Sequence, residues 1–256
     1  MRRVLCAALL AAAAARAAEA GEQTARYRAG GGDARLFEQY DNDGYSLEVA
    51  AGSDGGLDLE VRVSDGPLSS AAPFPTGAAR EASLPPAPDR DAFANRAAQG
   101  SRTLEEAVRR ILLAVASEVV YDADHTRRQD PAAVFGSRRA YCVGFAELSV
   151  DLLRRAGITA RTVQGILRTD ASNPAYDVAI GGAYHRWIEV YYPDRGFVFS
   201  DPRLSINGVD ARYIPFSTRA LVRPKSLRLT AVSAQGELKY DPVRAGNATV
   251  RVRVAR

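Results

Sequence analysis

Three side chains in this sequence have the types and the order needed for acyl transfer through a thiol: Cys142, His185 and Asp201. A cysteine attacks as its thiolate, a histidine can take up and return a proton, and an aspartate can hold the imidazole in one orientation. The only other cysteine, Cys6, lies in an N-terminal leader. Loss of the leader leaves Cys142 without an intramolecular disulfide partner, so it is either an inert buried filler or a nucleophile. We expect the nucleophile, with His185 as its base and Asp201 as the orienting acid.

The leader has the features of a secretory signal. It starts with basic residues, continues with an apolar run over residues 4–15, and offers small residues for cleavage after Ala18 or Ala20. The run is too short to span a bilayer as a helix, and no later stretch suits a membrane span. An uncleaved anchor is the alternative. We therefore expect residues 1–20 to be removed and the protein to be exported, either to the periplasm or out of the cell.

Charge and composition exclude several classes of partner. The formal net charge is +4 at pH 7, and three arginines of the leader contribute to it, so the mature protein is only weakly basic. Its basic residues are scattered rather than clustered, which argues against nucleic acid as a partner. The sequence has no glycine-rich phosphate loop and no paired-cysteine metal pattern, so we expect neither a cofactor nor a metal. The oligomeric state stays open.

The rest of the chain is expected to fold in four parts. Residues 21–65 alternate apolar with polar side chains around a turn at Asp54-Gly55-Gly56, which predicts a small antiparallel β unit with one wet face. Residues 66–98 are rich in Pro and Ala and are expected to be a linker. Residues 99–215 contain the three side chains and form the core. Residues 216–256 are expected to be a C-terminal β extension that ends in an alternating strand.

Two helices are expected in the core. Thr103 and Glu106 form a capping box, and apolar residues at helical spacing follow as far as Val119, so this helix packs into a core. The second helix starts at Cys142 and ends near Gly157, a good αL terminator. Cys142 then lies in a first turn, where unpaired amides and the helix dipole favour an anion. Its own amide can donate to an oxyanion.

Short strands are expected over residues 158–166, 186–192 and 197–200. Asn207-Gly208 predicts a tight hairpin, and its two arms are residues 204–206 and 213–214. The order of strands, helices and strands favours the α+β class over a doubly wound sheet.

The strand register sets a geometric condition on the three residues. A turn over residues 193–196 would place Asp201 opposite Ile188 or Glu189, three or four residues from His185. That offset is roughly 10–13 Å along the strand, too far for contact. A β-bulge or an intervening offset would close the gap. We predict it near one of two residues, Ser200 or Trp187.

The segments around the three side chains resemble the transglutaminase-like superfamily. Residues 136–148 and their continuation to Gly165 are similar to the family's nucleophile helix, which ends in the same kind of Arg-Ala-Gly-Ile stretch. Residues 185–191 look like its histidine strand, and residues 196–202 look like its aspartate strand. The resemblance extends over residues 103–215. It implies a papain-like core, in which the helix bearing the cysteine packs on an antiparallel sheet bearing the histidine and the aspartate.

Two positions depart from the family pattern. Phe197 stands where the family often has Trp, and Arg203 stands where Thr often follows the Asp-Pro pair. The side-chain oxyanion donor that some members carry has no certain counterpart here, and Tyr121 is a candidate. These departures bear on substrate and rate more than on the three residues.

Other residues near the motifs have simpler expected roles. His125 lies in a charged loop and is expected to be solvated. Trp187 and Tyr191 are expected to line the site or to fill the core. Glu147 and Glu189 are expected to lie on a helix surface and in a strand pair, respectively.

The resemblance implies an exported enzyme that forms a thioester from a peptide or side-chain amide, which water or an amine then resolves. Hydrolysis is expected over amine crosslinking because water is abundant and nothing identifies an amine site. The location favours cell-envelope protein or peptide as the substrate. Arylamine acetyl transfer uses a similar triad, but the Arg-Gly-Gly lead-in to the cysteine is absent and cytosolic acetyl donors would be out of reach. The alternative from a different class is a non-catalytic module that holds peptide in its cleft.

Overall fold

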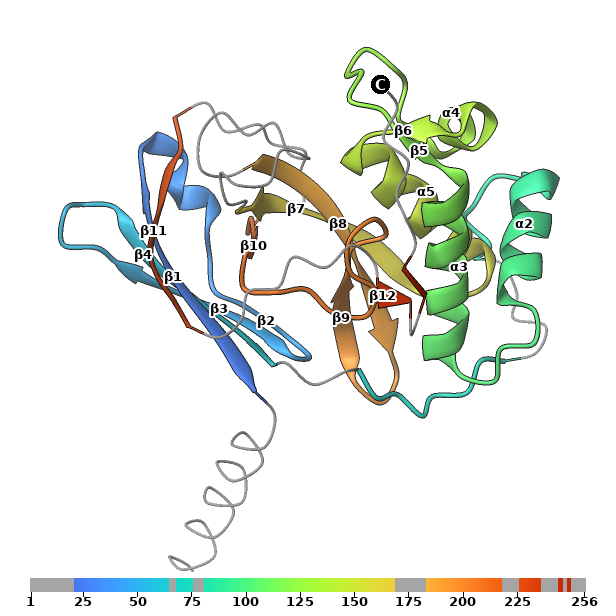
Figure 1. Cartoon of the computed structure of the whole chain (residues 1–256), viewed down its shortest axis with the longest axis horizontal. Coiled ribbons are helices and arrows are strands. Elements are labelled where there is room, and N and C mark those ends of the chain that lie inside the picture. Colours follow the sequence, from blue (N-terminus) through green and yellow to red (C-terminus); the bar gives the residue numbers. More distant parts are fainter. Residues whose placement is uncertain are drawn as a thin grey trace, which may run out of the picture.

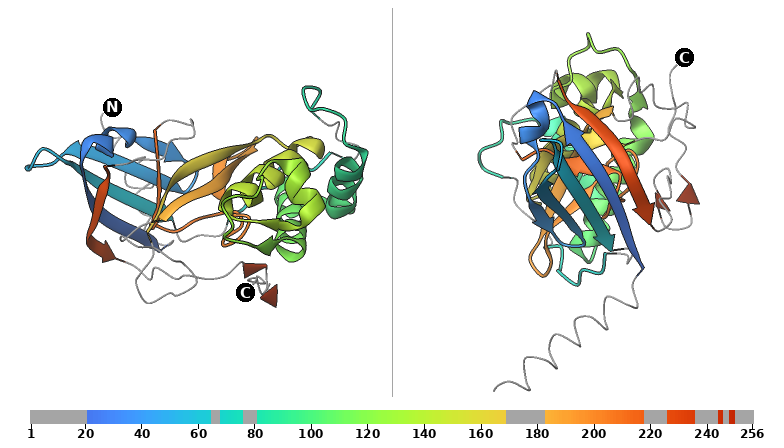
Figure 2. Two further views of the ribbon diagram at one scale, coloured as in Figure 1. Left: turned by 90° about the horizontal axis from the view of Figure 1, so that it is seen from above. Right: turned by 90° about the vertical axis from the view of Figure 1, so that its left-hand side faces the viewer.

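Three layers make up the part of the chain that the computed structural model describes, namely residues 21–64, 68–75, 81–168, 183–217, 226–235, 244–245 and 248–249. A five-stranded sheet packs against a four-stranded sheet, and helices cover the far side of the four-stranded sheet (Figure 1 and Figure 2). This mixture of helices and antiparallel sheets confirms the expected α+β class. The predicted signal, residues 1–20, lies outside the described residues.

The five-stranded sheet combines an early and a late part of the chain. Its order is β11-β1-β4-β3-β2, and neighbouring strands are antiparallel. The turn between β3 and β4 lies where it is expected, with Gly55 at a φ of 81°. β11 comes from the predicted C-terminal β extension and pairs with β1, so the two predicted β segments share one sheet. The elements are β1 (Glu22–Gly30), η1 (a 3-10 helix, Gly32–Leu36), β2 (Tyr40–Asn42), β3 (Tyr45–Ala51), β4 (Leu57–Ser64) and β11 (Arg228–Gln235).

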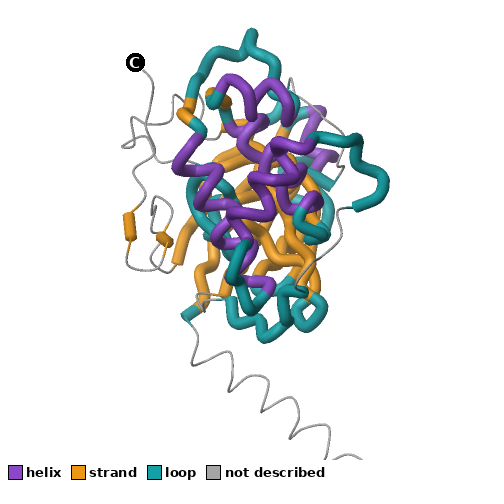
Figure 3. The backbone as a smooth tube through the Cα atoms, turned by 90° about the vertical axis from the view of Figure 1, so that its right-hand side faces the viewer, coloured by secondary structure: helices purple, strands orange, loops and turns teal. Residues whose placement is uncertain are grey.

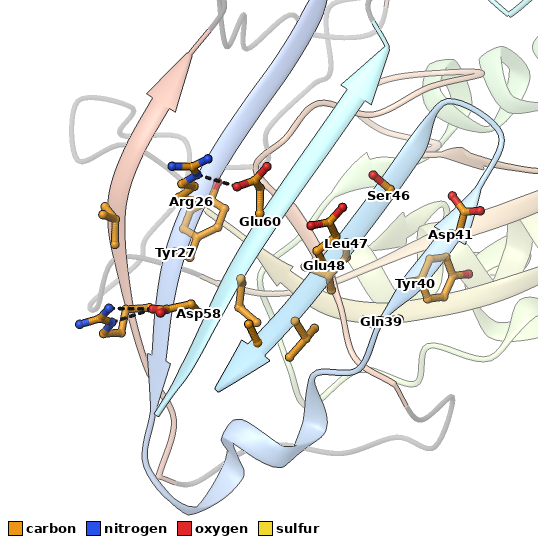
Figure 4. A pocket seen from close by; sticks show the side chains of 15 residues that line it. Arg26, Tyr27, Gln39, Tyr40, Asp41, Ser46, Leu47, Glu48, Asp58 and Glu60 are labelled. Carbon is orange, nitrogen blue, oxygen red and sulfur yellow. Dashed lines mark hydrogen bonds and ion pairs between the residues drawn. The ribbon is translucent and has the colours of Figure 1, made fainter. Parts of the chain in front are cut away.

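One face of this sheet carries charged side chains, as the alternating pattern predicts. Arg26 and Glu60 lie 2.6 Å apart, and Arg28 and Asp58 lie 2.8 Å apart (Figure 4). These residues line a hollow of about 910 Å³ that reaches from β2 to β11. Because these charges are paired across strands, they suit a solvated face.

The other face of the five-stranded sheet packs against the four-stranded sheet. Tyr27, Leu47 and Val61 from the first sheet share a buried hydrophobic cluster with Trp187 and Tyr213 from the second. Removal of this apolar surface from water stabilises the contact between the sheets. The N-terminal β unit is therefore built onto the sheet that carries His185.

The four-stranded sheet has the order β10-β7-β8-β9 and is antiparallel. Its strands are β7 (Ala160–Leu167), β8 (Ala183–Tyr192), β9 (Gly196–Ser200) and β10 (Tyr213–Pro215). The first three correspond to the three strands expected from the sequence.

The predicted hairpin at Asn207-Gly208 is wrong. β10 pairs with β7 and not with residues 204–206. The reason is a local turn that closes on Asp201, whose carbonyl accepts from the amides of Leu204 and Ser205 at 3.2 and 3.0 Å. Residues 204–206 are therefore not free to extend as a strand.

The helices cover the four-stranded sheet on the side away from the five-stranded one (Figure 3). They bury apolar stripes of α3 and α5 in a second cluster, to which β8 contributes Ile188 and Val190. None of the helices in the described ranges has the length and apolar character needed to cross a membrane. The helices are α2 (Pro88–Ala98), α3 (Leu104–Glu118), α4 (Pro131–Ser137) and α5 (Cys142–Arg155), with short strand pairs β5 (Val120–Tyr121) and β6 (Arg139–Ala140), and β12 (Arg244–Ala245) and β13 (Ala248–Thr249).

Two helix starts differ in part from expectation. Thr103 Oγ1 accepts from the Glu106 amide at 3.2 Å as predicted, but the Glu106 carboxylate accepts from the Arg102 amide, at 3.0 Å.

α2 begins at Pro88, inside the segment expected to be a linker. Proline fits the first helical position because no amide donor is needed there. Phe93 then packs into the helical cluster, so the Pro-rich composition overstated the length of the linker.

Candidate active site

Cys142 is the first residue of α5 and is partly exposed. The residue before it, Tyr141, is the N-cap without a side-chain cap, and its amide donates to Gln129 Oε1 at 3.1 Å. Gly144 leaves room for this glutamine, because a Cβ at this position would lie 2.5 Å from Oε1. The first amides of a helix have no intrahelical partners, so those at the start of α5 can stabilise an anion.

His185 stands between Cys142 and Asp201. Its Nε2 lies 2.5 Å from Asp201 Oδ2, and both side chains are buried. Because Nε2 faces the carboxylate, Nδ1 is the ring nitrogen left for the Cys142 thiol, which lies near enough for the imidazole to lower its pKa. The backbone amide of Arg186, the next residue on β8, also lowers the pKa of the thiol. The structure therefore brings the three predicted residues together, with a hydrogen bond between His185 and Asp201.

The strand ladder explains how Asp201 reaches His185. β8 and β9 pair without a register shift as far as Ile188 and Ser200, and the chain leaves this ladder at Asp201. The loop between the strands is residues 193–195, one residue shorter than predicted, which brings Asp201 closer to His185. The remaining offset of about two positions, or about 7 Å, is spanned by the two side chains. The predicted register was therefore wrong by one residue, and the paired part of the ladder holds no β-bulge. The chain leaves the ladder directly after Ser200, one of the two places predicted for a bulge or an offset.

Within the described residues, Asp201 meets three hydrogen-bond donors. Besides His185, the Tyr213 hydroxyl donates to Oδ2 at 2.8 Å and the Arg203 amide donates to Oδ1 at 2.9 Å. Burial raises the pKa of the Asp201 carboxyl, but the His185 charge and these hydrogen bonds outweigh burial and lower the pKa. The carboxyl is therefore ionised at neutral pH and can hold the imidazole in one orientation.

The pKa shifts of the thiol and the imidazole favour an ion pair. Burial raises the pKa of the Cys142 thiol, yet the hydrogen bond and charge of His185, with the Arg186 amide, lower it overall. Burial lowers the pKa of His185, but Asp201 and, to a smaller extent, Cys142 raise it to about 9. Both shifts favour transfer of the thiol proton to the imidazole.

Arg203, one of the two departures from the family pattern, lies near the site. Its side chain is buried, and its guanidinium stands 3.8 Å over the ring of Tyr121. The pKa of the Tyr121 hydroxyl is raised by burial and by the charge of Cys142, while Arg203 opposes the rise. Tyr121 is therefore within electrostatic reach of the thiol and stays a candidate donor to an oxyanion.

The other aromatic residues named from the sequence divide between core and surface. Trp187 is fully buried and its ring stacks on that of His185, with centroids 6.1 Å apart. Tyr191 is exposed on β8. His125 is exposed, as expected, and its ring meets the edge of Tyr141, the residue before Cys142, at 4.7 Å.

Two glutamates near the site have supporting contacts. Glu147 lies 2.7 Å from Arg186 and joins α5 to β8. Glu189 is fully buried and accepts from Arg161 at 2.5 Å and from the hydroxyl of Tyr40 on β2. Glu147 therefore has the helix role expected of it, whereas Glu189 also joins the two sheets.

Sequence reasoning missed Tyr213, Gln129 and the Arg186 amide. Tyr213 lies on a strand that pairs with β7 rather than with β9, so no spacing links it to Asp201. A signal for Gln129 was available in Gly144. Glycine is costly inside a helix, and its presence there indicates a close neighbour.

The comparison with family models covers this part of the chain. Residues 91–202 match the model of the Transglutaminase-like superfamily. This range contains Cys142, His185 and Asp201, and the match confirms the resemblance read from the sequence. Residues 91–202 are thus similar to transglutaminase-like domains.

Known proteins of similar sequence or structure are distant. An uncharacterized protein of Bacillus subtilis, YebA, is 39% identical over 75 residues, which are 27% of this chain and 10% of that protein. The chain therefore spans about a tenth of the length of that relative. A proposed cysteine protease from Cytophaga hutchinsonii has a TM-score of 0.46 and 11% identity over 90% of this chain and 94% of that chain. A proposed protease from Parabacteroides distasonis has a TM-score of 0.34 and 16% identity over 70% of this chain and 39% of that chain.

Proposed function

We propose that the protein is an exported, cysteine-dependent enzyme that transfers the acyl group of peptide or side-chain amides, with hydrolysis favoured over crosslinking. The observation that carries the proposal is the meeting of Cys142, His185 and Asp201 at the start of α5, with His185 Nε2 2.5 Å from Asp201 Oδ2. Export rests on the signal pattern of residues 1–20. Cell-envelope protein or peptide is the substrate class that this location would offer.

In the first half of the reaction, the Cys142 thiolate attacks the carbonyl carbon of the amide, and the carbonyl oxygen gains negative charge. The first-turn amides of α5 can donate hydrogen bonds to this oxygen. The His185 imidazolium then gives its proton to the amine as the C–N bond breaks. The amine leaves, and an acyl thioester on Cys142 and a neutral imidazole remain.

In the second half, water attacks the thioester and His185 takes one proton of the water. The C–S bond breaks, the acyl group leaves as a carboxylic acid, and the thiolate–imidazolium pair is restored. Asp201 holds the imidazole in place through both halves. An amine that replaced the water would give a new amide by the same steps.

Iodoacetamide labelling tests whether the thiol is activated. At pH 6 an ordinary thiol is less than about 1% ionised, so a Cys142 thiolate should react roughly 100-fold faster than a reference peptide thiol. Mass spectrometry of the labelled peptides separates Cys142 from Cys6. A rate equal to that of the reference thiol would contradict an activated nucleophile and leave a non-catalytic peptide-binding module on the same fold.

A comparison of the native protein with Cys142→Ala on a cell-envelope extract tests for turnover. A covalent acyl adduct on Cys142, trapped by acid quench and found by mass spectrometry, would identify the substrate. Release of a free carboxylate would support hydrolysis, and incorporation of an added amine would support crosslinking. Equal processing of the extract by both proteins would contradict the enzyme proposal.

A further inference from the structure

Tyr213 makes a contact that the proposed reaction steps do not use. Its hydroxyl donates at 2.8 Å to Oδ2 of Asp201, the same oxygen that faces His185 Nε2 at 2.5 Å. The three side chains are all at most 5% exposed. Each hydrogen bond needs its own direction at the shared oxygen, so the pair of bonds restricts where that oxygen can lie.

Tyr213 is itself fixed from the five-stranded sheet. The hydroxyl of Tyr45 on β3 donates to the Tyr213 carbonyl at 2.6 Å, and the hydroxyl of Tyr27 on β1 donates to the Ala211 carbonyl at 2.7 Å. The two bonds join residues that are 168 and 184 positions apart in the sequence. Both tyrosines are buried, where a well-made hydrogen bond is hard to replace.

The ring of Tyr213 is held as firmly as its backbone. It meets Trp187 edge-on with centroids 5.4 Å apart, and it lies 5.8 Å from the His185 ring. Packing on the ring and bonding at the backbone together place the hydroxyl beside Asp201, to which it donates.

We propose that Tyr213 is a positioning residue for Asp201, and that the five-stranded sheet sets its place through Tyr45. The inference rests on the proposed function, because it assigns a task within the series formed by Cys142, His185 and Asp201. The five-stranded sheet then supports the site and is not a separate binding unit. The contacts run from the Tyr45 hydroxyl to the Tyr213 backbone, and from the Tyr213 hydroxyl to the carboxylate that orients the imidazole.

A tyrosine with a purely structural hydroxyl offers a matched control. Tyr192 is also buried in the four-stranded sheet, and its hydroxyl donates to Asn207 Oδ1 at 2.7 Å. Tyr192→Phe and Tyr213→Phe therefore remove the same atom from the same sheet. Only the second change leaves Asp201 Oδ2 free to turn away from the imidazole.

Titration of the imidazoles by NMR tests the inference directly. The chain has two histidines, so His185 can be followed with the exposed His125 as an internal reference. Tyr213→Phe is expected to increase the acid dissociation constant of His185 by about fivefold, because a less well-placed Asp201 supports the imidazolium less. Tyr192→Phe should leave that constant unchanged. Identical titration of His185 in the native protein and in Tyr213→Phe would overturn the inference.

Two further variants separate positioning from general structure. In an Asp201→Asn background, Tyr213→Phe should have no further effect on His185, whereas an effect on packing would persist. Tyr45→Phe keeps the Tyr213 hydroxyl but removes its anchor, and should shift His185 in the same direction by about twofold. This variant decides the inference should Tyr213→Phe fail to fold. No shift in Tyr45→Phe would overturn the role of the five-stranded sheet.

These outcomes are distinct from those that test the proposed function. Titration of His185 does not need a reactive thiol, so slow labelling of Cys142 would remove the acyl-transfer proposal and the titration would still decide the role of Tyr213. A reactive thiol with unchanged His185 titration in Tyr213→Phe would keep the proposed function and reject the inference.

Discussion

At the scale of the residue, the imidazole of His185 interacts with both other ionisable groups of the site, the Asp201 carboxylate and the Cys142 thiol. It lies between a buried carboxylate and a thiol, and its proton decides whether the thiol and the imidazole form an ion pair. Burial alone would remove that proton, but Asp201 reverses the effect. The proposed chemistry therefore depends on the contact between His185 and Asp201 as much as on the placement of the thiol.

Stability should depend on pH through the same imidazole. The pKa of His185 is about 9 in the folded protein against an ordinary value of 6.5, so folding favours the protonated ring. The contribution of His185 to the free energy of unfolding is complete below about pH 6.5, and it is lost as the pH rises through about 9. The lowered pKa of the Cys142 thiol acts in the opposite sense over this range, so the comparison is made in Cys142→Ala. Urea unfolding of this variant at pH 6 and at pH 9.5 should show a lower free energy of unfolding at the higher pH. Asp201→Asn should reduce the difference, and an equal difference in both proteins would reject Asp201 as its cause.

Replacing each histidine in turn should show which of the two activates the Cys142 thiol. His185→Gln is expected to slow iodoacetamide labelling of Cys142 at pH 6 by about tenfold or more, because the thiolate loses its counter-charge. His125→Gln alters an exposed ring beside Tyr141 and should stay within about twofold of the native rate. Labelling rates measured by mass spectrometry decide between them. An equal loss in both variants would reject His185 as the specific partner of the thiol.

At the scale of the element, the start of α5 depends on the loop that precedes it. Gly144→Ala would place a methyl group 2.5 Å from Gln129 Oε1 and 2.8 Å from the Cβ of Ala140. We expect a loss of about 1–3 kcal/mol in the free energy of unfolding, together with slower labelling of Cys142. Gly136→Ala on α4 is the matched control, since a Cβ there meets nothing within 4 Å. An unchanged free energy of unfolding in Gly144→Ala would show that the loop adjusts to the methyl group without loss of stability.

The elements that could be predicted are those that local chemistry decides. The cap at Thr103, the start of α5 at Cys142 and the turn at Gly55 all follow from a few adjacent residues. The pairing of β10 and the place of β11 depend on contacts across the whole chain, which the sequence pattern does not contain. A difference of one residue in the loop before Gly196 was enough to change the β8–β9 register, because a glycine at positive φ suits both loop lengths.

The same division holds within the site. Cys142, His185 and Asp201 stand in segments with recognisable neighbours, so their types and order could be read directly. Tyr213 and Gln129 act through single hydrogen bonds that the fold creates. Their local sequence resembles that of any buried strand or surface loop, and only the three-dimensional structure identifies them.

At the scale of the whole molecule, Glu189 joins the two sheets. It accepts from Arg161 on β7 and from Tyr40 and Asn42 on β2. Glu189→Ala should lower the free energy of unfolding by about 3 kcal/mol, because it leaves a partly buried guanidinium and two polar groups without their acceptor. Arg128→Ala removes an exposed ion pair with Asp130 and should have no measurable effect. A loss below about 1 kcal/mol in Glu189→Ala would mean that apolar packing alone joins the sheets.

The pairing of β1 with β11 has a consequence for the order of folding. β1 ends at Gly30 and β11 begins at Arg228. β1 is therefore synthesised early but can pair with β11 only after almost 200 further residues have been added. Pairings between such distant segments form slowly, whereas the helices around α5 can form from local contacts. The sheet that anchors Tyr213 is therefore completed late. A chain that is still emerging from the ribosome would therefore hold Cys142 on a formed helix before the sheet behind Tyr213 is complete.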